Sequence, residues 1–392
     1  MSGTQPSLSH TNAARLNKLS LPSLRVLHAN VVLLILALSI CASARAQVSL
    51  STVATDQSVE GLSNHFGVPF GGTVDQNGDY AFLGDAATAA FYRHAGTPAA
   101  VRILQIGDPV PGITGSRIVA FLNGGGINSS GHVVFAVRLA TASGVPGGAL
   151  LTYDGTSVQL VVSSSDIAPG TGGKTYGLAI TPVGINDNGV IAFITNLLPI
   201  PGIGVAQRTL FMVPSGGGTA VRVLGAGDAA PGTGTISSLQ NPSGFNPVNA
   251  LGEVLVPCVV QQSVGGRHPG FFVGSVAGGV ANVQRVVVGG DAAPPPTSGT
   301  FSNPISAFLS DNGSVAFGAA TNTTFIPATW LWTAPSTITR FAATGDPVSS
   351  NLAGGGFWPV PSPRPLTPLG IFSSAPVSQA GPLAMRSFAI MP

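Results

Sequence analysis

The residues best suited to chemistry in this sequence form a short acidic run early in the chain. Asp75, Asn77 and Asp79 present side-chain oxygens at alternating positions around Gly78, as the first half of a calcium-binding loop does. Such a loop closes with a glutamate, but Ala86 stands at that position. The run therefore has two interpretations, a calcium site or a plain turn, and calcium is the one cofactor that the sequence suggests.

The sequence contains no other recognisable catalytic pattern. Four histidines follow residue 46, none with a second histidine or a cysteine at metal-ligand spacing: His65, His94, His132 and His268. The only glutamates are Glu60 and Glu253, so a set of convergent general acids and bases is hard to assemble. No G-x-S-x-G elbow appears with plausible partners. These features favour a non-enzymatic protein and identify no reaction.

A recurring aspartate forms the second candidate set. It lies in a marker of the form G-D-x-x-P-G, with some drift between copies: Asp108, Asp166, Asp228, Asp291 and Asp346. A ring of such acids could bind a cation or a substrate. Glycine before the aspartate and proline soon after it favour a local role, in which the carboxylate accepts backbone N–H groups and fixes the exit from a strand.

Four arginines stand six residues before a marker aspartate: Arg102, Arg222, Arg285 and Arg340. We expect them on an outermost strand, where a charged side chain discourages edge-to-edge pairing. A basic belt that binds a ligand is the alternative.

A nine-residue pattern indicates the elements that carry these residues. Residues 127–135 read I-N-S-S-G-H-V-V-F, and related runs occupy 74–82, 185–193, 248–256, 309–317 and, in worn form, 377–385. Asn, Asp or Ser opens a turn, glycine takes the positive-φ position, and alternating residues begin the next strand. The pattern predicts a β-hairpin whose structural positions are Asn128, Gly131, Asn186, Gly189, Asn249, Gly252 and Gly313.

With a weak first copy at Asp56, the marker aspartates are 52–63 residues apart. The hairpin pattern recurs in step with them, and each unit contains four strand-like runs. The first run of a unit precedes the hairpin, for example residues 117–122 or 174–180. Six such units predict an all-β fold, a six-bladed β-propeller of four-stranded antiparallel blades. A β-solenoid, a string of sandwiches and a different blade count are the alternatives.

The predicted repeat units cover 57–107, 108–165, 166–227, 228–290, 291–345, and 346–392 together with 47–56. The last unit lacks a fourth strand, and residues 48–53 resemble fourth strands. We therefore expect the N-terminal strand of the mature chain to close the ring of a single domain spanning 47–392.

Residues 1–46 resemble a signal peptide, with a basic segment, an apolar segment and a small-residue cleavage site. They contain four of the 16 basic residues and none of the 14 acidic residues, so the remaining chain has a formal charge of −2. We expect an exported protein, located outside the cell, on its surface or in the periplasm. No membrane span after cleavage and no nucleic-acid partner are expected.

The hairpin units, the markers and the leader together resemble secreted bacterial repeat proteins known as choice-of-anchor proteins, whose function is largely uncharacterised. The resemblance covers residues 48–385. It supplies no catalytic residues, and the anchoring segment that often ends such proteins has no counterpart before Pro392.

The sequence favours a secreted or envelope-associated binding or scaffold module for an unknown polysaccharide or protein. The alternative is a propeller hydrolase or lyase, with or without a metal. That alternative requires several of the hairpin carboxylates to converge on one mouth of the channel: Asp75, Asp79, Asp187, Glu253 and Asp311.

Overall fold

The computed structural model describes residues 70–74, 77–84, 89–93, 97, 100–198, 206–241, 247–344 and 346. Within these residues the chain is all β and forms no helix, so none of the described segments is a helix able to span a bilayer. The expected leader, the expected closing strand at 48–53, and the sixth unit beyond Asp346 lie outside the described residues.

The strands form five four-stranded antiparallel sheets. The first sheet contains β1 (Phe70–Val74), β2 (Tyr80–Gly84), β3 (Ala89–Arg93) and β4 (Val101–Gln105). The second contains β5 (Arg117–Ile127), β6 (Val133–Ala140), β7 (Pro146–Tyr153) and β8 (Val158–Ser163). The third contains β9 (Ile180–Ile185), β10 (Ile191–Leu197), β11 (Gln207–Val213) and β12 (Val221–Gly225). The fourth contains β13 (Thr235–Leu239), β14 (Glu253–Gln261), β15 (Arg267–Ala277) and β16 (Val280–Val288). The fifth contains β17 (Ile305–Leu309), β18 (Val315–Ala319), β19 (Ala328–Thr333) and β20 (Thr337–Ala343).

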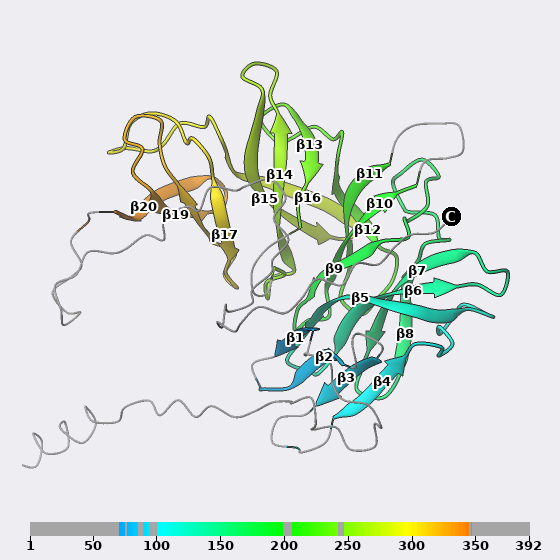
Figure 1. Cartoon of the computed structure of the whole chain (residues 1–392). Coiled ribbons are helices and arrows are strands. Elements are labelled where there is room, and N and C mark those ends of the chain that lie inside the picture. The colour runs from blue at the N-terminus through cyan, green and yellow to red at the C-terminus, as the bar shows by residue number, and fades with distance from the viewer. Residues whose placement is uncertain are drawn as a thin grey trace, which may run out of the picture. The chain divides into compact units, whose positions relative to one another are not determined.

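Each sheet is a meander in which the strand order follows the chain order, and the five sheets succeed one another from blue to orange in Figure 1. The predicted unit of four antiparallel strands is confirmed for these five sheets. The hairpin pattern also marks strand ends, because β5 ends at Ile127, β6 begins at Val133, β9 ends at Ile185 and β10 begins at Ile191.

Two strand boundaries differ from the sequence-based expectation. Strand β5 continues to Ile127, beyond the expected run of 117–122. The first strand of the third sheet begins at Ile180, although the apolar run suggested residues 174–180. Thr175 instead forms isolated bridges with Ile167, just after the marker aspartate, and with Leu198 at the end of β10. The residues before Ile180 thus extend the marker turn.

The core lies between successive sheets, because each central sheet buries both faces. On β6, Val133, Phe135 and Val137 belong to the cluster shared with the first sheet, while Val134 and Ala136 belong to the cluster shared with the third sheet. Alternation of side chains along a strand sends successive residues to opposite faces. A near-continuous apolar run is therefore required here, where a sheet with one solvated face would alternate with polar residues.

The inner strands of neighbouring sheets come very close. A Cβ atom added at Gly125 on β5 would lie 2.2 Å from the Cβ of Pro182 on β9, a separation that real side chains do not tolerate. Glycine at this point therefore allows the second and third sheets to approach.

Cys258 lies on β14 in the cluster between the third and fourth sheets. It is 1% exposed, and burial raises the pKa of its thiol to about 12. The thiol remains protonated at neutral pH and behaves as a small apolar side chain.

Candidate functional site

Three buried asparagines organise the hairpin turns that begin the second strand of the second, third and fourth sheets. Asn128, Asn186 and Asn249 are 3%, 2% and 1% exposed. The Oδ1 of Asn186 accepts the backbone N–H groups of Asn188 and Val190 at 3.1 and 2.8 Å. The Oδ1 of Asn128 accepts the N–H groups of Ser130 and His132 in the same way, and that of Asn249 accepts the N–H of Glu253. The glycines at the fourth position of these turns, including Gly131, Gly189, Gly252 and Gly313, have positive φ values of 76° to 83°.

The other end of each asparagine reaches the next sheet. The Nδ2 of Asn128 donates to the carbonyl oxygen of Asn186 at 3.0 Å, and the Nδ2 of Asn186 donates to that of Asn249 at 2.8 Å. The Nδ2 of Asn249 donates to the carbonyl oxygen of Ser310 at 3.0 Å. We call this series the asparagine ladder. It fixes the hairpin turns of sheets two to five at one level.

The aspartates beside the ladder also link adjacent turns. The Oδ1 of Asp187 accepts the backbone N–H of Ser129 at 2.7 Å, and the Oδ1 of Asp311 accepts that of Ala250 at 3.1 Å. Each carboxylate is therefore held by the turn of the preceding sheet. This contact gives both aspartates a structural role, and among the described residues their second oxygens accept no hydrogen bond.

The calcium candidate has a different environment. Asp75 lies outside the described residues. The Nδ2 of Asn77 donates to the carbonyl oxygen of Ser129 at 2.7 Å, and the Oδ2 of Asp79 accepts the hydroxyl of Tyr92 at 2.6 Å. Among the described residues, no group of three or more His, Cys, Asp or Glu side chains could hold a metal ion. Calcium binding at this run remains a prediction.

The marker aspartates make one repeated backbone contact. In all five, Oδ2 accepts the N–H of the residue three positions earlier, at 2.7 to 2.9 Å. The aspartates are Asp108, Asp166, Asp228, Asp291 and Asp346, and their donors are Gln105, Ser163, Gly225, Val288 and Ala343. The carboxylate thus caps the end of the outer strand, which is the local role favoured by its turn sequence.

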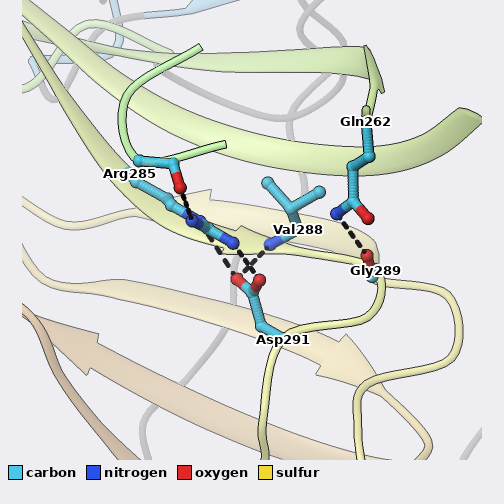
Figure 2. Close-up of polar contacts among 6 residues, drawn as sticks. Gln262, Arg285, Val288, Gly289 and Asp291 are labelled. Carbon is cyan, nitrogen blue, oxygen red and sulfur yellow. Dashed lines mark hydrogen bonds and ion pairs between the residues drawn. The ribbon is translucent and has the colours of Figure 1, made fainter. Parts of the chain in front are cut away.

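Three of the expected edge arginines form ion pairs with their marker aspartates. Arg222 contacts Asp228 at 2.7 Å, and equivalent pairs join Arg285 to Asp291 and Arg340 to Asp346. Figure 2 shows Arg285 and Val288, both on β16, reaching the carboxylate of Asp291.

The arginine position differs in the first two sheets. Arg102 bonds to Gln105 instead, and Leu160 occupies the equivalent place in the second sheet. The marker aspartates are therefore spread over successive sheets, each with its own local partners, and the structure does not gather them into one acidic site.

A β-bulge accompanies this position in every sheet. The pairing register between the third and fourth strands shifts one residue after Arg102, Leu160, Arg222, Arg285 and Arg340. A bulge bends and twists its strand locally, and here it separates the arginine from the marker by an extra residue. The sequence carries no direct signal for the bulge, so the ion pairs were not predicted.

The same side chains touch the preceding marker. The Nη1 of Arg285 donates to the carbonyl oxygen of Gly232 at 3.2 Å, and a Cβ at Gly170 would lie 3.6 Å from the Cβ of Arg222. A Cβ at the equivalent Gly112 would lie 3.2 Å from the Cδ2 of Leu160. The outer strands of the second, third and fourth sheets therefore lie against the marker loop of the sheet before them.

The arrangement with the clearest capacity for a ligand is a cleft of about 620 Å³ between the second and third sheets. We call it the hairpin cleft, because turns of both sheets form its rim. Its polar lining comprises His132, Thr152, Asp154, Gln159, Asp187 and Asn188. Its apolar lining includes Val161, Ile185, Ile191 and Val213, and the loop of Gly216, Gly217 and Gly218 borders it. Its volume falls within the range of about 300–1,000 Å³ found for small-molecule sites.

One wall of the hairpin cleft carries a tightly held carboxylate. The Oδ1 of Asp154 accepts the backbone N–H groups of Ser157 and Thr156 and the Thr156 hydroxyl at 2.7 to 2.9 Å. Its Oδ2 accepts the Ser157 hydroxyl at 2.9 Å and the Gln159 amide at 3.3 Å. These bonds hold the pKa of Asp154 well below its usual range, and the bond from the backbone N–H of Ser157 contributes most. Asp154 is therefore ionised at neutral pH.

The sequence alone did not reveal this cleft. His132 and Asp187 come from hairpin turns of two different units, and Asp154 comes from the turn between β7 and β8. Of the hairpin carboxylates that the enzymatic alternative requires to converge, Asp187 alone among the described ones lines this cleft. The available signal was the D-G-T-S turn at residues 154–157, whose aspartate suits a turn that bonds its own backbone.

Comparison with known protein families identifies the family of the chain. A model for a family of unknown function, DUF7453, matches residues 67–363. The chain belongs to the DUF7453 family. This match covers all five sheets of the DUF7453 fold described above. No curated protein matches the chain.

Solved structures show only remote similarity to this DUF7453 protein. A polysaccharide lyase, Uly1, is 12% identical with a TM-score of 0.34, covering 71% of this chain and 61% of its own. A Hadza microbial sialidase, Hz136, is 11% identical with a TM-score of 0.32, covering 67% and 54%. A Trypanosoma rangeli sialidase in complex with sialic acid is 10% identical with a TM-score of 0.34, covering 71% and 48%. The chain thus spans less than two thirds of each, and similarity at this level carries no argument about activity.

The asparagine ladder predicts a large loss of stability for Asn186→Ala. The substitution leaves the N–H groups of Asn188 and Val190 and the carbonyl oxygen of Asn249 without their side-chain partner. We expect the free energy of unfolding to fall by about 2–4 kcal/mol in denaturant titrations. Asn188→Ala, which removes one exposed bond to Ala250, is the control and costs less than about 1 kcal/mol. Equal losses for the two variants would contradict the ladder.

The marker contacts predict a graded series. Asp291→Ala removes both the strand cap and the ion pair, so we expect the free energy of unfolding to fall by about 1–3 kcal/mol. Arg285→Ala removes the ion pair and the bond to Gly232 but keeps the strand cap, so it costs about 0.5–1 kcal/mol, less in 1 M NaCl. Arg102→Ala is the control, because Arg102 bonds to Gln105. In chemical denaturation, the loss of unfolding free energy should decrease in the order Asp291→Ala, Arg285→Ala, Arg102→Ala. Any other order would contradict this assignment.

Proposed function

We propose that this protein is an exported binding module whose ligand site is the hairpin cleft. The observation that carries the proposal is the cleft itself, about 620 Å³ in volume and lined by polar groups from two sheets over an apolar floor. A polysaccharide or a protein segment is the class of ligand. The leader-like residues 1–46 support export to the cell surface, the periplasm or the medium, and the resemblance to choice-of-anchor proteins agrees with that location.

The chemistry of the cleft favours binding over turnover. Asp154 accepts five hydrogen bonds and stays ionised, so it is a poor general acid near neutral pH. Asp187 is tied to the backbone of Ser129. A hydrolase or lyase is the second candidate, since the His132 ring lines the same cleft as Asp187 and imidazole is a common proton-transfer group.

We further propose that the fold is a six-bladed propeller. The fifth sheet exposes large apolar side chains on its first and last strands, with Ile305, Phe308 and Phe341 at 38%, 56% and 74% exposure. Residues 377–385 repeat the hairpin pattern, and residues 48–53 resemble fourth strands. A sixth blade built from 346–392 and 47–56 would cover that apolar face and close the ring with main-chain hydrogen bonds.

Ring closure predicts that residues 47–56 are needed for stability. Removing them from the leaderless protein eliminates several main-chain hydrogen bonds between paired strands, each worth about 0.5–1.5 kcal/mol net. It also exposes an apolar strand edge. We expect a markedly lower melting temperature or aggregation, compared with the protein that begins at Gln47, by differential scanning calorimetry. Identical melting temperatures would show that another arrangement ends the series of sheets.

The binding function predicts that filling the hairpin cleft abolishes ligand capture. Gln159→Trp places a large ring on the cleft wall, and we expect at least about a tenfold loss of affinity for a ligand found on a glycan and peptide array. Val101→Trp is the matched control, because Val101 holds the equivalent place seven residues before Asp108 in the first sheet and is 53% exposed. Binding that survives Gln159→Trp, or turnover of the ligand, would refute the proposal.

A further inference from the structure

The hairpin cleft has fixed negative charge on both walls. Asp154 lies in the turn between β7 and β8 of the second sheet, and Asp187 lies in the turn between β9 and β10 of the third. Backbone and hydroxyl donors from Thr156 and Ser157 hold the first, and the N–H of Ser129 holds the second. No lysine or arginine is among the described residues that line the cleft. An anionic ligand would therefore meet repulsion from two directions.

Apart from the second oxygen of Asp187, the groups left free among the described residues of the cleft are hydroxyl, amide and imidazole groups. The His132 ring and the Thr152 hydroxyl have no hydrogen-bond partner among the described side chains and backbone groups, and the Oδ1 of Asn188 is unused while its Nδ2 donates to Ala250. Both oxygens of Asp154 are already occupied by donors, so that carboxylate has little capacity to pair with an ammonium group. Hydroxyl, amide and imidazole groups are suited to ligand hydroxyls, which both donate and accept.

The floor of the cleft is aliphatic. Val161 from the second sheet and Ile185, Ile191 and Val213 from the third line it. A surface of this kind can cover the C–H face of a sugar ring while the polar rim bonds to its hydroxyls. Charge, free donors and floor together point to one class of ligand.

Building on the proposed binding function, we propose that the hairpin cleft selects an uncharged, hydroxyl-rich glycan segment and rejects anionic glycans. Asp187 is a specificity-determining residue in this scheme. Its charge repels carboxylated or sulfated sugars, while its bond to Ser129 keeps it in place. The rejection is electrostatic and weakens as salt concentration rises.

The test uses titration calorimetry of the mature protein with cellohexaose, mannohexaose and xylohexaose as neutral probes, hexagalacturonate as the anionic probe and hexalysine as the cationic probe. We expect at least one neutral hexasaccharide to bind about tenfold or more tightly than hexagalacturonate at low salt. The difference in affinity between the neutral and the anionic probe should become smaller in 0.5 M NaCl. Preference for hexagalacturonate or hexalysine would overturn the proposed ligand class.

A matched pair of variants isolates the charge. Asp187→Asn keeps an oxygen that can accept the N–H of Ser129 but removes the charge, and we expect it to reduce the discrimination against hexagalacturonate about threefold or more. Asp311→Asn is the control, because Asp311 makes the same contact to Ala250 outside the cleft lining, and it should leave the discrimination unchanged. Equal effects of both variants, or none from Asp187→Asn, would overturn the role of Asp187.

These outcomes separate two failures. If the probes bind with equal affinity whatever their charge, and Gln159→Trp abolishes that binding, the proposed selectivity is refuted. The proposed binding function is then still supported. Absence of binding to every probe contradicts the glycan proposal and leaves the peptide arm of the array as the test of the binding function.

Discussion

The asparagine ladder is the constraint on which the rest of the structure depends. Each buried amide uses its oxygen to shape its own turn and its nitrogen to hold the next sheet, so a single side chain couples local and long-range structure. A buried amide with unmet hydrogen bonds is costly. The turns can therefore be satisfied only when neighbouring sheets stand at the correct height, and this height places His132 and Asp187 on opposite sides of one cleft.

Packing between sheets and the contacts at their outer strands reinforce the same arrangement. Strand β6 sends alternate apolar side chains into two different clusters, so a single sheet cannot bury its own core. On the outer strand of the fourth sheet, Arg285 forms an ion pair with its marker aspartate and a hydrogen bond to the preceding marker loop. Stability in such a chain is the sum of many interfaces between nearest neighbours.

Much of the fold could be predicted from the sequence because the hairpin turn has strict residue requirements. Glycine at positive φ and an Asx residue three positions earlier locate the ends of β5 and β9 to the residue. The cap made by Asp291 also follows from its turn sequence. The ion pair with Arg285 does not, because it depends on a bulge in β16. The hairpin cleft escaped prediction because its residues come from separate units and meet only through stacking of the sheets.

The ladder also bears on how such a chain can change in length over evolution. Each amide donates to a backbone carbonyl of the next turn, and Ser310 receives the bond from Asn249 as well as an asparagine does. The hydrogen bond between two successive turns therefore does not depend on the side chain of the residue whose carbonyl accepts it. A duplicated or deleted unit would meet the same acceptor on its new neighbour. Gene-level gain or loss of whole units can therefore proceed while the residues around the hairpin cleft diversify separately.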